Sequence, residues 1–200
     1  MVQMKDYRKI KGNLIHKTSI INWKKVKIGS GNIIGPYVII GENAQHPREN
    51  SDGNISIGKN NIFREFCRVN LPTKLKKKTV IKNNCYLMSS TTIDHDCHIE
   101  DNVIFSNNVT LGGNIYVMKN TQFGINTCIH QNLVIGSYCM FGMGSIITKK
   151  LKSSAGYIYI GSPAKKIKKN KIGLLKFKIS KSQLELENKR LKKILIKWKN

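Results

Sequence analysis

The stretch from Ile81 to Leu151 decides the fold: IKNNCYLMSSTTIDHDCHIEDNVIFSNNVTLGGNIYVMKNTQFGINTCIHQNLVIGSYCMFGMGSIITKKL. Counting from Ile81, every sixth residue is large and apolar, without exception as far as Ile147. The series comprises Ile81, Leu87, Ile93, Ile99, Phe105, Leu111, Val117, Phe123, Ile129, Ile135, Phe141 and Ile147. A short fixed period of this kind indicates stacked repeats that bury their apolar side chains against one another.

Two further positions of the hexad support the repeat. Four residues after nearly every large residue stands a small or β-branched one, and three cysteines are explained as small core residues at this position: Cys85, Cys97 and Cys139. Three residues after the large one, Asn dominates: Asn84, Asn102, Asn108, Asn114, Asn120, Asn126 and Asn132. Asn tolerates positive φ, which a tight corner requires. Each hexad therefore predicts a short strand and a corner, and three hexads predict one triangular coil of 18 residues.

The repeat continues upstream less regularly, and two segments interrupt it. The upstream positions are Ile15, Ile21, Ile28, Ile34, Ile40, Ile57 and Phe63. The interruptions are residues 45–56 (QHPRENSDGNIS) and 70–79 (NLPTKLKKKT). Loops that project from a rigid solenoid usually bind something. We therefore expect an all-β parallel β-helix over residues 1–164 with loops at these two places.

A basic tail follows the repeats over residues 165–200, and we expect it to be helical. Ser180 or Ser182 can cap its final helix. The apolar residues of that helix fall roughly on one face: Leu184, Leu191, Leu195 and Trp198. We expect this stripe to pack on the end of the β-helix or on a neighbouring subunit. Contact with a membrane surface stays open as the alternative.

The net charge and the cysteine content of the chain limit the classes of function that it can have. Lys and Arg number 35 against 11 acidic residues, a formal charge of +24, which attracts an acidic partner. The lysines are concentrated in the tail and in residues 74–78, and few aromatic residues lie among them. We therefore do not expect the chain to bind nucleic acid. The chain has no apolar run of membrane-spanning length and no secretory signal, which predicts a cytoplasmic protein. Five cysteines without a C-x-x-C motif suggest neither a disulfide framework nor a zinc ribbon.

Stacking places chemically useful residues in a column, because residues 18 apart lie above one another. His95, Gly113 and Gln131 form one such line, and Asp96 and Asn114 begin the next, which continues through Asn132. The backbone N–H of a glycine can donate a hydrogen bond to an oxyanion, and a nearby imidazole can act as a general base. The structural alternative is that Asp96, Gly113 and Asn114 serve only the corner. His98 has no partner in the column and is interpreted as a surface residue.

The segment HDCH (95–98) resembles a metal cluster only superficially. The repeat directs Cys97 into the core and His95 outward, so the two side chains cannot share one ion. We therefore expect no metal site.

The sequence resembles a known family in two segments, LMSSTTIDHDCHIEDNVIFSNNVTLGGNIYV and CIHQNLVIGSYCMFGMGSIITK. The family is the acyl-carrier-protein-dependent UDP-N-acetylglucosamine O-acyltransferases, which begin lipid A assembly and belong to the hexapeptide-repeat acyltransferases. Its distinctive feature is the combination of HDC, LGG and HQ, each one coil apart. The resemblance implies a left-handed parallel β-helix and a homotrimer with active sites between subunits. It implies no bound cofactor, because the acyl donor is carried on phosphopantetheine of acyl carrier protein or on coenzyme A.

The resemblance also implies roles for individual residues. His95 matches the general base, Asp96 orients or polarises its imidazole, and the N–H of Gly113 stabilises the oxyanion. The residues assigned to the sugar-nucleotide substrate are Asn114, His130 and Gln131. Asn170, in NKIGLLKF, matches a family position near the acyl donor, and Lys176 is its expected basic partner.

The sequence departs from the family at three places. The family usually has His where this chain has Thr92 and Asn114, and residues 45–56 do not match the family's substrate loop. GSPAKKI (161–167) also resembles the end of acetyl-coenzyme A-dependent sugar acetyltransferases. An acetyl-coenzyme A-dependent sugar O- or N-acetyltransferase acting on a surface polysaccharide therefore stays open as the first alternative. The second alternative is a non-catalytic basic binding protein.

Overall fold

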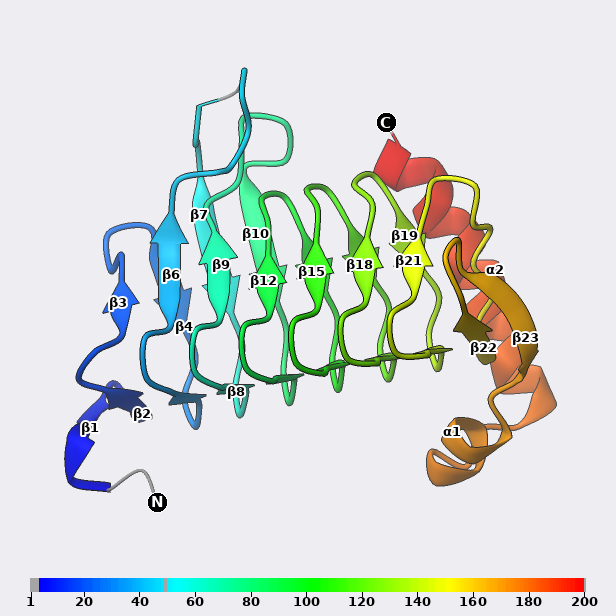
Figure 1. Cartoon of the computed structure of the whole chain (residues 1–200), viewed down its shortest axis with the longest axis horizontal. Helices are drawn as coiled ribbons and strands as arrows, with labels where there is room; N and C mark the ends of the chain where they lie inside the picture. Colours follow the sequence, from blue (N-terminus) through cyan, green and yellow to red (C-terminus); the bar gives the residue numbers. More distant parts are fainter. Residues whose placement is uncertain (1–3, 49, 200) are drawn as a thin grey trace.

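A computed structural model describes residues 4–48 and 50–199, which form a long stack of triangular coils (Figure 1). Each coil gives one short strand to each of three sheets, called here sheets A, B and C. The chain is a left-handed parallel β-helix, as the resemblance implies. A 3₁₀ turn, η1 (Met4–Asp6), precedes the first strand.

The sheets are built almost entirely from strands of two to four residues. Sheet A has the order β1 (Tyr7–Ile10), β2 (Asn13–His16), β5 (Ile33–Ile34), β8 (Ile62–Phe63), β11 (Tyr86–Leu87), β14 (Ile104–Phe105), β17 (Gln122–Phe123), β20 (Met140–Phe141), β22 (Tyr157–Ile160) and β23 (Lys165–Lys169). Sheet B comprises β3 (Ile20–Ile21), β6 (Ile39–Glu42), β9 (Arg68–Asn70), β12 (Thr92–Ile93), β15 (Thr110–Leu111), β18 (Cys128–Ile129) and β21 (Ile146–Ile147). Sheet C comprises β4 (Val26–Ile28), β7 (Asn54–Ile57), β10 (Lys78–Ile81), β13 (His98–Ile99), β16 (Tyr116–Val117) and β19 (Val134–Ile135).

The register confirms the 18-residue coil. Tyr86 pairs with Ile104, and Thr92 pairs with Thr110, each 18 residues further on. All strand pairs within the coil stack are parallel, whereas β1–β2 and β22–β23 pair antiparallel at the two ends. The hexad residues are the core: all twelve are buried in one continuous cluster. Phe105, Phe123, Phe141 and Tyr159 stack ring on ring in sheet A with centroid spacings of 5.0 to 5.2 Å.

The corner and cysteine predictions are confirmed. Every Asn of the predicted corner series has positive φ, from 57° at Asn126 to 63° at Asn132. Cys85, Cys97 and Cys139 are buried in the core. An additional ladder of buried amides runs through Asn13 and Asn32, whose side chains are joined at 2.8 Å.

Both interruptions are loops at the corner between sheets B and C, and they project together from the upper edge of Figure 1. They are shorter than predicted. Residues 43–53, called here the first loop, connect β6 to β7, and residues 71–77, called here the second loop, connect β9 to β10. Residues 54–56 and 78–79 already belong to strands, because they pair in register with each other across β7 and β10.

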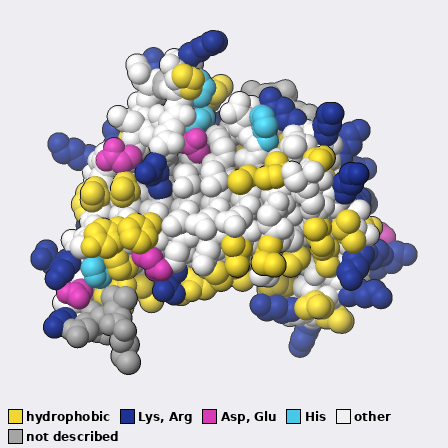
Figure 2. Space-filling model, in the orientation of Figure 1, with side chains coloured by type: hydrophobic (Ala, Val, Ile, Leu, Met, Phe, Trp, Pro, Cys, Tyr) yellow, Lys and Arg dark blue, Asp and Glu magenta, His cyan; other side chains and the backbone are white. Residues whose placement is uncertain are grey.

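The tail begins with β23, and its helical part starts at α1 (Lys171–Lys176), followed by α2 (Lys181–Lys199). Ser180 caps α2, because its Oγ accepts the N–H of Gln183 at 3.2 Å. Leu191, Leu195 and Trp198 pack against Tyr116 and Val134 on sheet C, so the predicted apolar stripe of α2 covers the β-helix. On the face shown in Figure 2, lysine and arginine side chains gather toward the ends of the molecule and the projecting loops.

Candidate active site

The candidate catalytic residues lie at the corner between β12 and β13, on the edge from which both loops project. Asp96 takes the left-handed conformation of a corner residue, with φ 61°. β12 pairs with β15 at an offset of 18 residues, so Gly113 occupies in the next coil the position that His95 occupies in its own. A side chain at position 113 would overlap the His95 imidazole. The room left by the glycine is therefore filled by the ring of the candidate base.

His95 and Asp96 form a hydrogen-bonded pair. Nδ1 of His95 lies 2.7 Å from Oδ2 of Asp96, and the two residues are 6% and 0% exposed. A carboxylate only accepts, so the proton of the neutral ring belongs on Nδ1 and the lone pair on Nε2. The backbone N–H of His95 is also fixed, since it donates to Oδ1 of Asp94 at 2.8 Å. This arrangement suits a general base whose ring orientation and tautomer are set by the neighbouring acid.

The two members of the pair stabilise each other's charged form. Burial lowers the pKa of His95, but the hydrogen bond to Asp96 and the charges of Asp94 and Asp96 outweigh it and hold the pKa above its usual value. Burial raises the pKa of Asp96, but hydrogen bonds from His95 and Thr73 outweigh it and hold that pKa below its usual value. Asp96 is therefore ionised at neutral pH, and His95 is a stronger base than a free imidazole.

The second loop supplies a residue that the sequence did not single out. The backbone N–H of Thr73 donates to Oδ1 of Asp96 at 3.0 Å, and its hydroxyl lies 2.6 Å from Oδ2. The N–H of Asp96 in turn donates to Oγ1 of Thr79, 3.0 Å away. Every oxygen of the Asp96 carboxylate is thus hydrogen-bonded.

The first loop reaches the same corner. Its residue Asp52 donates a backbone N–H to the carbonyl of Pro72 at 2.9 Å, and Ser51 forms an antiparallel bridge with Thr73. The ring of His46 stands edge-on to that of His95, with centroids 5.4 Å apart and planes at 89°. The first loop therefore packs on the second and covers His95 with an imidazole.

The three residues assigned to the sugar-nucleotide substrate follow along the same edge of the stack. Asn114 is tied into the structure: its Nδ2 donates to Oδ1 of Asn132 at 2.8 Å, and its carbonyl accepts from Nε1 of Trp198 at 3.0 Å. His130 and Gln131 are exposed one coil beyond Gly113, and Nδ1 of His130 lies 3.1 Å from the carbonyl of Gln131. They extend the column above the His95–Asp96 pair.

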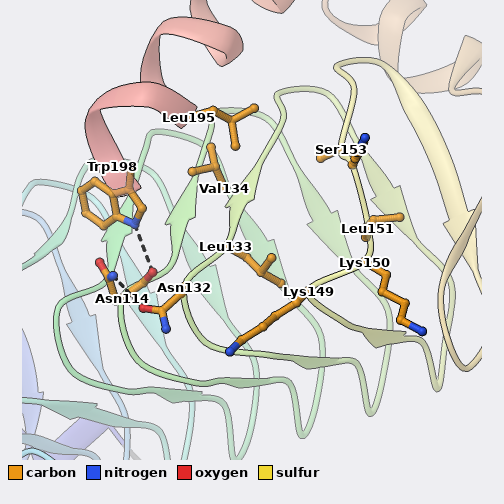
Figure 3. A pocket seen from close by; sticks show the side chains of 11 residues that line it. Asn114, Asn132, Leu133, Val134, Lys149, Lys150, Leu151, Ser153, Leu195 and Trp198 are labelled. Atoms are coloured by element: carbon orange, nitrogen blue, oxygen red, sulfur yellow. Dashed lines mark hydrogen bonds between the residues drawn. The ribbon is translucent and has the colours of Figure 1, made fainter. Parts of the chain in front are cut away.

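A cavity of about 650 Å³ opens between this edge and α2 (Figure 3). Its lining combines apolar side chains with three lysines, Lys149, Lys150 and Lys152. The lining residues are Asn114, Asn132, Leu133, Val134, Lys149, Lys150, Leu151, Lys152, Ser153, Leu195 and Trp198. Figure 3 shows the indole of Trp198 closing the end of the cavity over Asn114. Neither His95 nor Gly113 is among these lining residues.

The two residues assigned to the acyl donor lie on a different side of the triangle. Asn170 and Lys176 line a cavity of about 310 Å³ beside sheet A, together with Phe177. Asn170 is 9% exposed and caps α1: its Oδ1 accepts the N–H of Gly173 at 3.1 Å, and its Nδ2 donates to Tyr138 O at 2.9 Å. One chain therefore brings Asn170 and Lys176 together, but not with His95.

The interpretation of His98 as a surface residue is wrong. Its ring stacks on Tyr116 with centroids 4.5 Å apart and meets the edge of Trp198 at 6.3 Å. Burial lowers the pKa of His98 to about 4. The repeat predicts which residues point outward but not that α2 covers this part of sheet C.

Two observations concern the residues that the structure describes, 4–48 and 50–199. None of their helices combines the length and apolar character needed to cross a membrane. Within the same residues, no three or more His, Cys, Asp or Glu side chains gather into a group suited to a metal ion.

Comparison with known proteins places this geometry in a class. The family model "Bacterial transferase hexapeptide (six repeats)" matches residues 78–113. The LpxA UDP-N-acetylglucosamine acyltransferase from Bacteroides fragilis is 28% identical, with a TM-score of 0.81 over 92% of this chain and 71% of that one. LpxA from Acinetobacter baumannii is also 28% identical, with a TM-score of 0.67 over 90% and 81%.

A third solved structure, the UDP-N-acetylglucosamine acyltransferase from Campylobacter jejuni, supports the fold. It is 24% identical, with a TM-score of 0.73 over 88% of this chain and 82% of that one. Among curated proteins, no sequence matches the chain.

The repeat, the β-helix and these likenesses define a class: the chain is an acyltransferase with hexapeptide repeats. Within that class, its resemblance to the UDP-N-acetylglucosamine O-acyltransferases is confirmed by solved structures that align over about nine-tenths of its length. The non-catalytic alternative is therefore set aside.

Proposed function

We propose that this chain transfers an acyl group from an acyl-carrier-protein thioester to a hydroxyl, or an amine, of a UDP-amino sugar. The observation that carries the proposal is the buried His95–Asp96 pair, joined at 2.7 Å and lying against the backbone of Gly113. A base with a fixed tautomer beside a glycine N–H has the two elements that acyl transfer needs. The resemblance to the UDP-N-acetylglucosamine acyltransferases supports the choice of acceptor and donor.

The proposed reaction is a direct transfer. Nε2 of His95 removes the proton from the acceptor hydroxyl as its oxygen attacks the thioester carbonyl. The tetrahedral oxyanion accepts a hydrogen bond from the N–H of Gly113. When the intermediate collapses, the C–S bond breaks, and the imidazolium of His95 returns its proton to the departing thiolate.

The mechanism has no acyl-enzyme intermediate. Cys97, the thiol next to the pair, is 0% exposed, and burial raises its pKa. A thiol in that environment is not a nucleophile. Direct attack by the acceptor is therefore the route that the geometry supports.

The substrates of this proposal extend along the corner and onto a second subunit. Asn114, His130 and Gln131 line the sugar-nucleotide side. Asn170 and Lys176 bind the donor in a homotrimer, because their own chain holds them away from His95 and a neighbouring chain can present them to it. The charge of +24 favours both the acidic carrier protein and the nucleotide diphosphate. We retain the cytoplasm as the proposed compartment.

The stretch GSPAKKI (161–167) resembles the end of acetyl-coenzyme A-dependent sugar acetyltransferases and favours such an enzyme as a second candidate. Thr92 and Asn114 also replace histidines that are usual in the UDP-N-acetylglucosamine O-acyltransferases, and the side chain of Asn114 donates a hydrogen bond to Asn132. The contacts to the acceptor sugar must then differ from those of the family.

The experiment that separates the two candidates offers UDP-N-acetylglucosamine to the enzyme with either donor and identifies the product by mass spectrometry. The proposal predicts a long-chain acyl ester or amide formed only from acyl-carrier-protein thioesters. Transfer only from acetyl-coenzyme A would establish the second candidate. If neither donor gives a product with this acceptor, the proposed acceptor is wrong.

A further inference from the structure

Thr73 touches the acid of the candidate pair without touching the base. It lies in the second loop, outside the hexad register, and is 0% exposed, as is Asp96. Its backbone N–H reaches Oδ1 of Asp96 at 3.0 Å, and its hydroxyl reaches Oδ2 at 2.6 Å. Oδ2 is also the oxygen that accepts from Nδ1 of His95.

The direction of the hydroxyl bond follows from its other partner. Oγ1 of Thr73 accepts the backbone N–H of Leu75 at 3.2 Å. Because Asp96 is ionised and has no proton to give, the single hydroxyl proton of Thr73 points to Oδ2. The bond is therefore a charge-assisted one from a neutral donor to a carboxylate, which is among the stronger hydrogen bonds in proteins.

We infer that Thr73 is a positioning residue for the proposed transfer reaction: it holds the Asp96 carboxylate so that His95 keeps its orientation and its tautomer. Two bonds from one residue fix the plane of the carboxylate against rotation. The imidazole, bound at Nδ1, then keeps Nε2 free for the acceptor hydroxyl. The inference rests on the proposed function and adds a residue from outside the repeat to it.

The same contact sets the strength of the base. Thr73 shares the negative charge of Oδ2 with His95, so it limits how strongly Asp96 favours the imidazolium. The other titratable groups that face His95 are Asp94 on the same corner and His46 on the first loop. Loss of the Thr73 hydroxyl leaves those groups in place and gives His95 a more basic neighbour.

The second loop also explains why Thr73 is fixed. Its carbonyl accepts from Lys77 N at 3.1 Å, and the loop is tied to the first loop through Pro72 and Asp52. The side chain of Lys76 reaches the carbonyl of Trp198 at 3.2 Å, so the second loop is anchored to α2 as well. Thr73 therefore presents its donors from a backbone that is held on both sides.

The test compares Thr73→Val with Thr73→Ser in the transfer assay across pH. Val keeps the shape and the backbone N–H but removes the hydroxyl, whereas Ser keeps the hydroxyl. We expect T73V to lower kcat by about tenfold and to move the acidic limb of the kcat profile upward by about half a pH unit or more. We expect T73S to retain most of kcat and the normal limb.

The matched control is Thr127→Val. Thr127 is another buried threonine, and its hydroxyl donates to the carbonyl of Gly124 at 2.7 Å in a different corner. T127V should change the unfolding midpoint without moving the pH profile. If T73V does not fold, Thr73→Ala replaces it, with T73S still as the rescue.

The inference is overturned if T73V, or T73A in its place, keeps the normal kcat and pH limb, or if T73S is as impaired as the variant without the hydroxyl. Failure of the proposed function has a different signature, because the wild type itself would then form no acyl ester or amide of UDP-N-acetylglucosamine from acyl-carrier-protein thioesters. An inactive H95A beside a fully active T73V would overturn only the role of Thr73.

Discussion

The indole N–H of Trp198 donates to the backbone carbonyl of Asn114 across 3.0 Å. This bond joins the last turn of α2 to the corner that follows Gly113, so the C-terminal helix holds the peptide between Asn114 and Ile115, two peptides beyond the N–H of Gly113. The indole also packs edge-on against Tyr116 at 5.1 Å and beneath the Lys76 ammonium at 5.0 Å.

Replacement of Trp198 by Phe should keep most of the packing and remove the hydrogen bond. We expect a loss of about 1 kcal/mol in unfolding free energy, because the carbonyl of Asn114 loses its partner in a half-buried place. Urea unfolding measures it. The control is Trp23→Phe, since Trp23 lies at the N-terminal end of the stack and is 40% exposed. An equal loss in both variants would contradict the role of the bond.

The docking of α2 depends on a buried acid. Glu100 is 2% exposed and accepts hydrogen bonds from Tyr116, Arg190 and the N–H of Lys119. Burial raises the pKa of Glu100, but the bonds from Arg190 and Tyr116 outweigh it and hold the pKa below its usual value. Its contribution to stability is therefore complete above the ordinary carboxyl pKa and is lost as pH falls through the lowered pKa of the folded state.

We expect Glu100→Gln to cost about 2 kcal/mol at pH 7, a modest figure because Arg190 is 39% exposed, and clearly less at about pH 3, where protonation has removed part of the contribution of Glu100. Urea unfolding at the two pH values measures both. The matched variant is Glu187→Gln, which pairs with the same arginine from a more exposed place and should cost less. A loss for E100Q that does not change with pH would show that its charge is irrelevant.

The His95–Asp96 pair predicts a specific pH dependence of activity. The base must be neutral to act, so kcat should rise with pH through the pKa of His95, which stands above its usual value. In Asp96→Asn the ring loses the carboxylate, so the limb should move to lower pH while kcat falls by about a hundredfold or more. A pH profile of both enzymes tests this. If the limb of the pH profile does not move in D96N, Asp96 does not influence the pKa of the base.

The ring of His46, in the first loop, covers the ring of His95. Two substitutions distinguish the shielding of His95 by this ring from the effect of its polar nitrogens. His46→Ala removes the cover, so we expect faster modification of His95 by diethyl pyrocarbonate and a higher KM for the acceptor. His46→Phe keeps an edge-on ring and should protect His95 as the wild type does. Peptide mapping after timed modification gives the rate. Equal rates in H46A and the wild type would show that the first loop does not shield the base.

The repeat accounts for what could be predicted from the sequence and for what could not. A period of six fixes which residues lie 18 apart, so the core, the positive-φ corners and the placement of His95 below Gly113 all follow from it. The two loops lie outside that period, and so Thr73 and His46 carry no periodic signal. Residues 24 apart, such as Asn70 and Asp94, meet only because the second loop lengthens one coil.

The C-terminal part shows a second limit. The stripe on α2 predicts that the helix packs, but not that it packs on sheet C, where it covers His98. The resemblance assigns Asn170 and Lys176 to the donor, but the hexad period does not extend to them and predicts no position for them relative to His95. The structure gathers them beside sheet A with Phe177, on a different side of the triangle from His95.

The proposed role of His95 as the general base can be measured through the turnover of His95→Ala. The assay uses the donor and acceptor that the wild type accepts, and sedimentation confirms that the oligomer is unchanged. We expect transfer to fall by at least about a hundredfold while the protein remains folded. Turnover close to that of the wild type would contradict it.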